Sequence, residues 1–202
     1  MKFKDTGGDF EQPSIGTHVG ICVKVIDIGT QRSEYQGNAN IRRQCIIAWE
    51  LPNELMTEGD RAGKPFVVSR FYTCSLSTKA NLRKDLENWR GKEFSKLELE
   101  GFESKNILGK ACMLSLTASD KGKAKITGVM GLPKGTQVPD PSTPLLYFSL
   151  DEFNQTVFDG LSDGCKKFIT LSPEYRHIIE PPPSQQPSSG ASFDDLDDDI
   201  PF

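Results

Sequence analysis

The feature that most constrains the fold is an alternation of apolar and small or polar residues in the first half of the chain. Over residues 17–29, "THVGICVKVIDIG", every second position from Val19 to Val25 is apolar. A period of two residues is typical of a β-strand that is buried on one face. Four more strands are indicated by alternation or by β-branched and aromatic residues in segments 42–51, 64–76, 110–119 and 123–132.

Between the third and fourth of these segments the period changes to that of a helix. In residues 77–91, "STKANLRKDLENWRG", two leucines and a tryptophan recur at helical spacing. Ser77 or Thr78 is expected to cap the start of the helix, and Gly91 follows its end. Three strands, one helix and two strands is the element order of an OB-fold, a five-stranded Greek-key barrel with one helix. We therefore predict a mainly β chain with an OB-fold over residues 1–135.

The remainder of the chain divides into three parts of different composition. Residues 136–180 begin with a proline-rich connection and continue with apolar residues at helical spacing, so we expect a small helical extension packed on the barrel. Residues 181–193 carry no charged side chain and are rich in proline and serine, which predicts a disordered linker. Residues 194–202, "DDLDDDIPF", form an acidic tip.

Charge is distributed unevenly, although the net charge of the chain is only −4. Residues 61–134 hold 15 Lys and Arg against 7 Asp and Glu, a balance of +8, whereas the segments on either side are acidic. A solvated, lysine-rich surface is one explanation of this basic block. An electrostatic footprint for a polyanion is the other.

No pattern typical of an enzyme occurs in the sequence. It has no phosphate-binding glycine loop, no H-E-x-x-H motif and only two histidines, so we expect a protein without catalytic activity. A metal-dependent nuclease that uses scattered carboxylates, such as Asp27, Glu34 and Glu50, is the alternative. The five cysteines lack Cys-x-x-Cys spacing and are expected to be reduced core residues, so neither a metal nor another cofactor is predicted.

The sequence also bears on location. No apolar stretch approaches the roughly 20 residues that cross a bilayer, and the first residues are too polar for a signal peptide. We therefore expect a cytoplasmic protein that makes no membrane contact.

Cationic and aromatic side chains on the second and third strands favour a binding surface for single-stranded nucleic acid. Cations contact phosphates along such a groove, and each base that stacks on an aromatic ring is worth about 1–3 kcal/mol. The predicted phosphate contacts are Arg42, Arg43, Lys64, Arg70 and, in the last hairpin, Lys121, Lys123 and Lys125. The predicted stacking residues are Tyr35, Trp49 and Tyr72.

Some of these predictions depend on which face of a strand points inward. Trp49 shares its parity with Cys45 and Ile47, so core packing is the alternative for it. Phe71 and Tyr72 point to opposite faces, and we expect Phe71 to be buried and Tyr72 to be exposed. For the hairpin lysines, a role in solubility alone is the alternative.

The end of the chain resembles a known family. The last six residues, "DDDIPF", are similar to the acidic C-terminal tip of bacterial single-stranded DNA-binding proteins (SSBs), in which an OB-fold precedes a disordered linker and this peptide. The segments "KANLRKDLENWRG" and "SPEY" are similar to phage- or prophage-encoded proteins of that kind. The resemblance implies that the chain binds and protects single-stranded DNA, largely without sequence specificity, in DNA replication, recombination and repair. A recombination mediator or strand-annealing protein is the alternative.

The same resemblance implies that the tip recruits other replication and recombination proteins, of the exonuclease, helicase, primase or clamp-loader type, in a bacterial host cell. Physically, the aspartates are attracted to basic grooves, and the apolar end supplies an anchor. The partner-binding residues carried over by position are Asp197, Asp198, Asp199, Ile200, Pro201 and Phe202. The resemblance is compatible with a homo-oligomer and does not fix its size.

Overall fold

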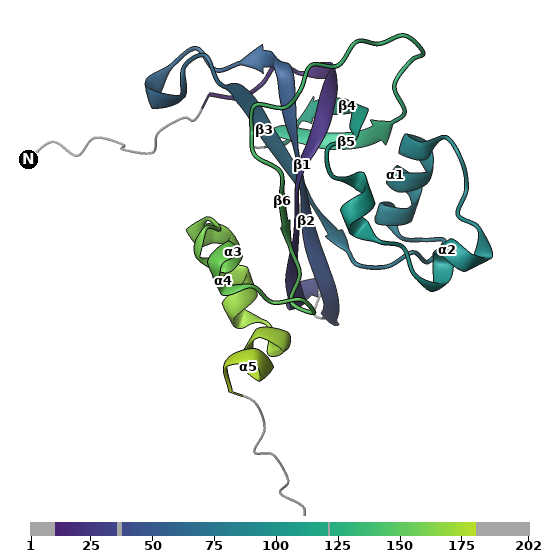
Figure 1. Ribbon diagram of the computed structural model, residues 1–202, viewed down its shortest axis with the longest axis vertical. Helices are drawn as coiled ribbons and strands as arrows, with labels where there is room; N and C mark the ends of the chain where they lie inside the picture. The colour runs from purple at the N-terminus through teal and green to yellow at the C-terminus, as the bar shows by residue number, and fades with distance from the viewer. Residues whose placement is uncertain (1–10, 36–37, 121, 181–202) are drawn as a thin grey trace, which may run out of the picture.

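A computed structural model describes the backbone of residues 11–35, 38–120 and 122–180, and the side chains in these ranges apart from those at positions 34, 35 and 38. The protein is mainly β. Six strands form one sheet in the order β3-β2-β1-β4-β5, with β6 paired to β1 (Figure 1). The strands are β1 Gly16–Tyr35, β2 Asn38–Leu55, β3 Pro65–Thr73, β4 Ala111–Ala118, β5 Ala124–Met130 and β6 Leu146–Phe148. All pairs are antiparallel except β1 with β6, which is parallel.

The long strand β1 gives the sheet its curvature. Its first part, Gly16 to Ile21, pairs with β4, and the part from Ile21 to Tyr35 pairs with β2. Register shifts after Cys22 and Asp27 interrupt the ladder with β2, and such bulges bend and twist a strand. The two ends of the sheet, β3 and β5, approach each other within 8 Å between Cα atoms.

Five short helices and two 3-10 turns complete the described part of the chain. They are α1 Asn81–Arg90, α2 Lys96–Glu100, α3 Gln155–Asp159, α4 Asp163–Leu171, α5 Pro173–Ile179, η1 Gly59–Arg61 and η2 Ser104–Ile107. None of these helices is both long and apolar enough to cross a bilayer. Residues 136–180 thus hold three helices and also the strand β6, which the sequence did not predict.

The helix predicted over residues 77–91 is α1, and its end is as expected. Gly91 adopts the left-handed conformation, with φ of 66°, that ends many helices. Its start differs, because the N-cap is Ala80 and no side chain caps it. The amide of Ala80 donates to the carbonyl of Ser77 at 2.9 Å, so Ser77 closes the preceding turn instead of capping the helix.

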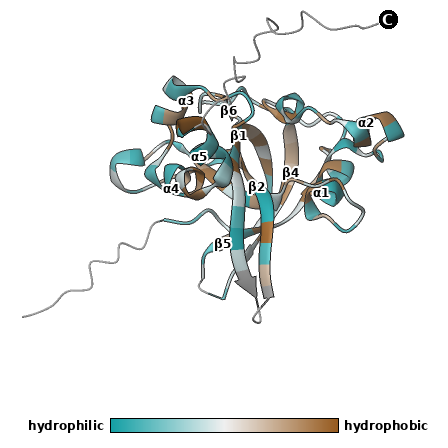
Figure 2. Cartoon of the chain, turned by 90° about the horizontal axis from the view of Figure 1, so that it is seen from below, coloured by the Kyte–Doolittle hydropathy of each residue, from teal (hydrophilic) through white to brown (hydrophobic). Residues whose placement is uncertain are grey.

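Two separate hydrophobic cores lie on the two faces of β1 and β2. Helices α1 and α2 lie on one side of these strands, and α3, α4 and α5 lie on the other (Figure 2). The inner core lies on the side of α1 and includes Cys45, Ile47 and Leu86. The outer core lies under α3, α4 and α5 and includes Ile26 and Ile46. The C-terminal helices therefore give the sheet a second covered face.

The connection from β5 to β6 crosses this outer face and is held there by Glu50. This carboxylate is 1% exposed, and its oxygens accept from the Ser142 amide at 2.9 Å, the Ser142 hydroxyl at 3.0 Å and the Thr143 amide at 2.6 Å. Burial raises the pKa of Glu50, but these hydrogen bonds outweigh it and hold the pKa below its ordinary value. Glu50, named above for a nuclease alternative, is a structural anchor.

Candidate nucleic-acid interface

The two aromatic residues predicted to stack from β2 and β3 lie in the inner core. Trp49 is 1% exposed and Tyr72 is 3% exposed. The register pairs Cys45 with Tyr72 and Ile46 with Phe71, so Tyr72 points inward and Phe71 outward. The predictions that Tyr72 is exposed and that Phe71 is buried are both wrong, since Phe71 is 49% exposed.

Tyr72 is buried in place of Phe71 because its hydroxyl has a polar partner outside β3, which the sequence of β3 does not reveal. The Tyr72 hydroxyl donates to Asp85 on α1 at 2.7 Å, which removes the cost of burying a phenol. Burial together with the neighbouring Asp85 carboxylate raises the pKa of Tyr72, so the phenol stays protonated. Trp49 is buried because it shares its face with Ile47 and because the ring of Trp89 lies 6.1 Å away.

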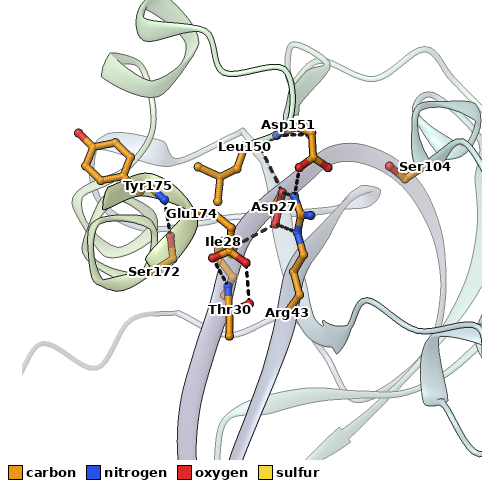
Figure 3. A network of polar contacts seen from close by, with 12 residues as sticks. Asp27, Ile28, Thr30, Arg43, Ser104, Leu150, Asp151, Ser172, Glu174 and Tyr175 are labelled. Carbon is orange, nitrogen blue, oxygen red and sulfur yellow. Dashed lines mark hydrogen bonds and ion pairs between the residues drawn. The ribbon is translucent and has the colours of Figure 1, made fainter. Parts of the chain in front are cut away.

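Two of the arginines predicted to contact phosphates form ion pairs with aspartates of the same chain. Arg70 Nη1 lies 2.9 Å from Asp85 Oδ2, and its guanidinium lies 5.2 Å from the centre of the Tyr72 ring. Arg43 Nη2 contacts Asp27 and lies 2.9 Å from Asp151 Oδ1 (Figure 3). The hydrogen bond to Asp27 raises the pKa of Arg43. The structure thus places both guanidinium groups in ion pairs and not on an open surface.

The Arg43 network also docks the C-terminal helices. Asp27 Oδ2 accepts from the Leu150 amide at 3.2 Å, and Glu174 of α5 accepts from the Thr30 amide at 2.9 Å and the Thr30 hydroxyl at 2.6 Å (Figure 3). Between these anchors, Gly29 has φ of 71°, and a Cβ there would lie 2.5 Å from the Cβ of Ser172. Only glycine allows both the conformation and this close approach. The position of α4 and α5 on β1 is therefore fixed from several sides.

The other predicted cations that the structure describes are exposed. Arg42 lies near one end of the outer face, and Lys64 precedes β3 at the other end, since Gln44 pairs with Thr73 and Leu55 with Pro65. The two ends are eight residues apart along β3, from Pro65 to Thr73, which is about 26 Å at about 3.3 Å per residue. Lys123 and Lys125 are exposed on the β4–β5 hairpin. Three of the predicted sites lie outside the described part of the chain. They are the side chain of Tyr35, Lys121 and the tip residues 197–202.

A hollow of about 260 Å³ lies on the outer face where β2 and β3 meet the segment that leads to α1. We call it the outer groove. Its lining includes Arg42, Gln44, Phe71, Thr73, Ser75, Ser77 and Lys79. None of its described lining residues is acidic, and neither Arg42 nor Lys79 forms an ion pair with any residue that the structure describes. The outer groove therefore combines free cations with an open aromatic ring.

A second ring extends this surface from the C-terminal helices. Phe168 of α4 is 38% exposed, and its centroid lies 5.4 Å from that of Phe71 in an edge-to-face arrangement. Gln31 Nε2 donates to the Phe168 carbonyl at 3.0 Å, which ties α4 to β1 at this point. Sequence reasoning missed Phe71, Phe168 and Lys79. For Phe168 and Lys79 no local pattern marks them, because only the packing of α4 and the turn after β3 brings them to the groove.

The arrangement suits a polyanionic chain that carries flat aromatic groups, because exposed cations lie beside exposed rings. Within residues 11–35, 38–120 and 122–180, no three His, Cys, Asp or Glu side chains gather as metal ligands. Asp27 and Glu50 serve the structural contacts given above. No protein-family model matches this chain, and no curated protein matches it in sequence.

Proposed function

We propose that this protein binds single-stranded DNA, largely without sequence specificity, and that the outer groove is the centre of the binding surface. The observation that carries the proposal is the combination found there: two partly exposed rings, Phe71 and Phe168, beside the cations Arg42 and Lys79, which form no ion pair with a described residue. Stacking on the rings is available to any base, and phosphates are attracted to the cations. Neither interaction depends on base identity, so little sequence preference follows.

The topology supports the same proposal. Strand order β3-β2-β1-β4-β5, a helix between β3 and β4, and contact between β3 and β5 correspond to an OB-fold, and we propose that this is the fold. OB-folds bind oligonucleotides on the face of their second and third strands, which is where the outer groove lies. Lys64, Lys123 and Lys125 would extend a cationic path toward the other end of the sheet.

The biological role follows from coating a single strand. We propose that the protein, without catalytic activity of its own, protects single-stranded DNA in the cytoplasm during replication, recombination and repair. Residues 197–202 would recruit partner enzymes, because an acidic peptide with an apolar end suits a basic groove with an apolar pocket. This part rests on the sequence of the tip.

The test is a titration of 5′-labelled oligo-dT followed by fluorescence anisotropy at several salt concentrations. A labelled DNA is the better reporter, because Trp49 is buried and the Trp89 Nε1 group donates to the Ala111 carbonyl inside the fold. We expect binding that weakens steeply with salt, since bound phosphates release counterions. Absence of binding at low salt would overturn the proposal. The same strand incubated with Mg²⁺ should stay at full length, and cleavage would favour the nuclease alternative.

A further inference from the structure

A second hollow, of about 360 Å³, opens at the end of the sheet where β3 stops. We call it the inner pocket. Its walls are mainly apolar and include Val25, Ile47, Leu82, Leu86, Phe102 and Ile107. Polar groups stand around it, among them Ser75, Ser104, Arg43 and Asp151. A mostly apolar cavity of this size with a few polar groups is typical of a small-ligand site.

The inner pocket adjoins the outer groove. Residues 74–77 run between the two hollows, and Ser75 lines both. Arg42 lines the groove while Arg43 lines the pocket, because neighbouring residues of β2 point to opposite faces. A strand that leaves the ring of Phe71 and passes over Ser75 therefore reaches the pocket.

Charge decides which part of a nucleotide suits the inner pocket. Asp27 and Asp151 both line it, and the single guanidinium of Arg43 is paired with both. The two carboxylates outnumber the one guanidinium, so the pocket carries an excess of negative charge that repels a phosphate. A neutral ring with N–H donors at its edge fits better, since its faces meet the apolar walls and its edge can donate to the exposed carboxylate of Asp151.

We propose that the inner pocket accepts one base of the single strand that is bound in the outer groove. The proposal rests on the proposed function and adds a site to it. It makes the path of the DNA turn around residues 74–77, with one base inserted beyond the stacked ones. Bound DNA should then cover Cys74, an exposed residue that lines the pocket.

Protection of Cys74 from alkylation tests the proposal with an intact pocket. Cys22, Cys45 and Cys112 are buried, so a Cys165→Ser background leaves Cys74 as the accessible thiol among the described residues. A hydrogen bond with Cys45 lowers the pKa of Cys74, which favours its reaction with iodoacetamide. Oligo-dT at ten times its Kd should slow alkylation about ten-fold, in proportion to the unbound fraction.

Two control ligands make this test specific for an inserted base. A saturating oligomer of the same length built from abasic nucleotides should leave the alkylation rate of Cys74 nearly unchanged. Equal protection by both oligomers would overturn the proposal, because it would show cover by the backbone alone. Protection by free thymidine at the same concentration of bases would also overturn it, because the pocket would then be a nucleoside site that does not depend on the bound strand.

Filling the pocket gives a second, independent measurement. Ser104 of η2 lines the inner pocket and is not part of the outer groove. Ser104→Phe should weaken oligo-dT binding about five-fold or more, the worth of one base contact. Leu97→Phe, at an exposed position of α2 that lines neither hollow, should change it less than about two-fold. Unchanged binding by a folded Ser104→Phe protein, checked by its thermal transition, would contradict the proposal.

The outcomes separate the two proposals. If the wild-type protein does not bind oligo-dT, the proposed function fails and the inner-pocket proposal fails with it. If the wild-type protein binds with strong salt dependence but Cys74 reacts at an unchanged rate, only the inner-pocket proposal fails. If Ser104→Phe does not fold, the Cys74 experiment decides alone.

Discussion

On the inner face of β2 and β3, Trp49 and Tyr72 are buried against α1, whereas on the outer face the ring of Phe71 stays half open. All three residues are aromatic, so aromatic character alone does not explain the difference. The second layer does: α1 covers the inner face, while the C-terminal helices cover the outer core around Ile46 and leave the end at Phe71 accessible. An aromatic residue becomes a candidate binding residue where the covering layer ends.

The two neighbouring arginines of β2 show the same contrast for charge. Arg43 points to the inner face and is paired with Asp27 and Asp151, whereas Arg42 points to the outer face and has no ion pair within the described residues. Removing a paired guanidinium destabilises the fold, because its carboxylate partner is left without a counter-charge, whereas a free guanidinium attracts a polyanion. The contrast between the two faces therefore makes separable predictions for stability and for DNA affinity.

The largest expected effect is on stability, from the inner face. Trp49→Ala should lower the free energy of unfolding by about 3–5 kcal/mol, because it removes a fully buried ring and leaves a cavity. Urea denaturation followed by far-UV circular dichroism measures this loss. Phe71→Ala, its outer-face counterpart, should cost less than about 1 kcal/mol in the same assay. Equal losses for the two variants would mean that the faces do not differ as described.

The next effect is on DNA affinity, from the outer face. Phe71→Ala should weaken oligo-dT binding by about 1–3 kcal/mol, which is about 5- to 150-fold in Kd, through the loss of a stacked base. Leu97→Ala is the matched control, since Leu97 is an exposed apolar residue on α2 and lies outside the outer groove. Anisotropy titrations at one salt concentration compare them. If the Phe71→Ala protein binds as tightly as the Leu97→Ala protein, the outer groove is not part of the DNA-binding surface.

We expect the two neighbouring arginines to have different roles: Arg43 should affect stability, and Arg42 should affect DNA binding. Arg43→Met should lower the free energy of unfolding by about 1–3 kcal/mol, because it leaves Asp27 without its charged partner. Arg42→Met should leave stability within about 0.5 kcal/mol of the wild type and reduce the slope of log Kd against log salt by about 1. Denaturation and salt titrations of both variants check this. The reverse assignment of the two effects would show that Arg43, and not Arg42, meets the phosphates.

The prediction with the smallest effect at neutral pH is the pH dependence of the free energy of unfolding. It arises from the carboxylates that hold the C-terminal helices and the β5–β6 connection in place. For Glu50 and Glu174, burial raises the pKa, but hydrogen bonds to the charged form outweigh it and set the folded-state pKa below the ordinary 4.5. The unfolded chain therefore takes up these protons first as the pH falls. The stability they contribute is complete above about pH 5 and is lost as the pH falls toward the folded-state values. Unfolding curves from pH 7 downward should show this loss, and a double Glu→Gln variant should show a flatter pH dependence. An identical pH profile for the double variant would remove these two groups as its cause.

The sequence predicted much of the sheet and little of its surface. Alternation located five strands, and the change of period located α1, because both patterns are local. The strand β6 has three residues and exists only by pairing with β1, so no local pattern marks it. The exposure of Phe71 depends on Asp85 in the next helix, which accepts the Tyr72 hydroxyl. The pairing of Arg43 depends on Asp151, more than a hundred residues further along the chain. Such long-range partners decide which predicted cations and rings are free.

Photochemical crosslinking most directly tests the claim that single-stranded DNA binds the outer face. A short oligo-dT with one 5-iodouracil, bound to the wild-type protein and irradiated, reports the aromatic side chain on which that base stacks. We predict that the crosslinked peptides contain Phe71 or Phe168, and that Phe71→Ala abolishes the first of these crosslinks. Crosslinks that form in good yield only at residues outside the outer groove and α4 would contradict this account.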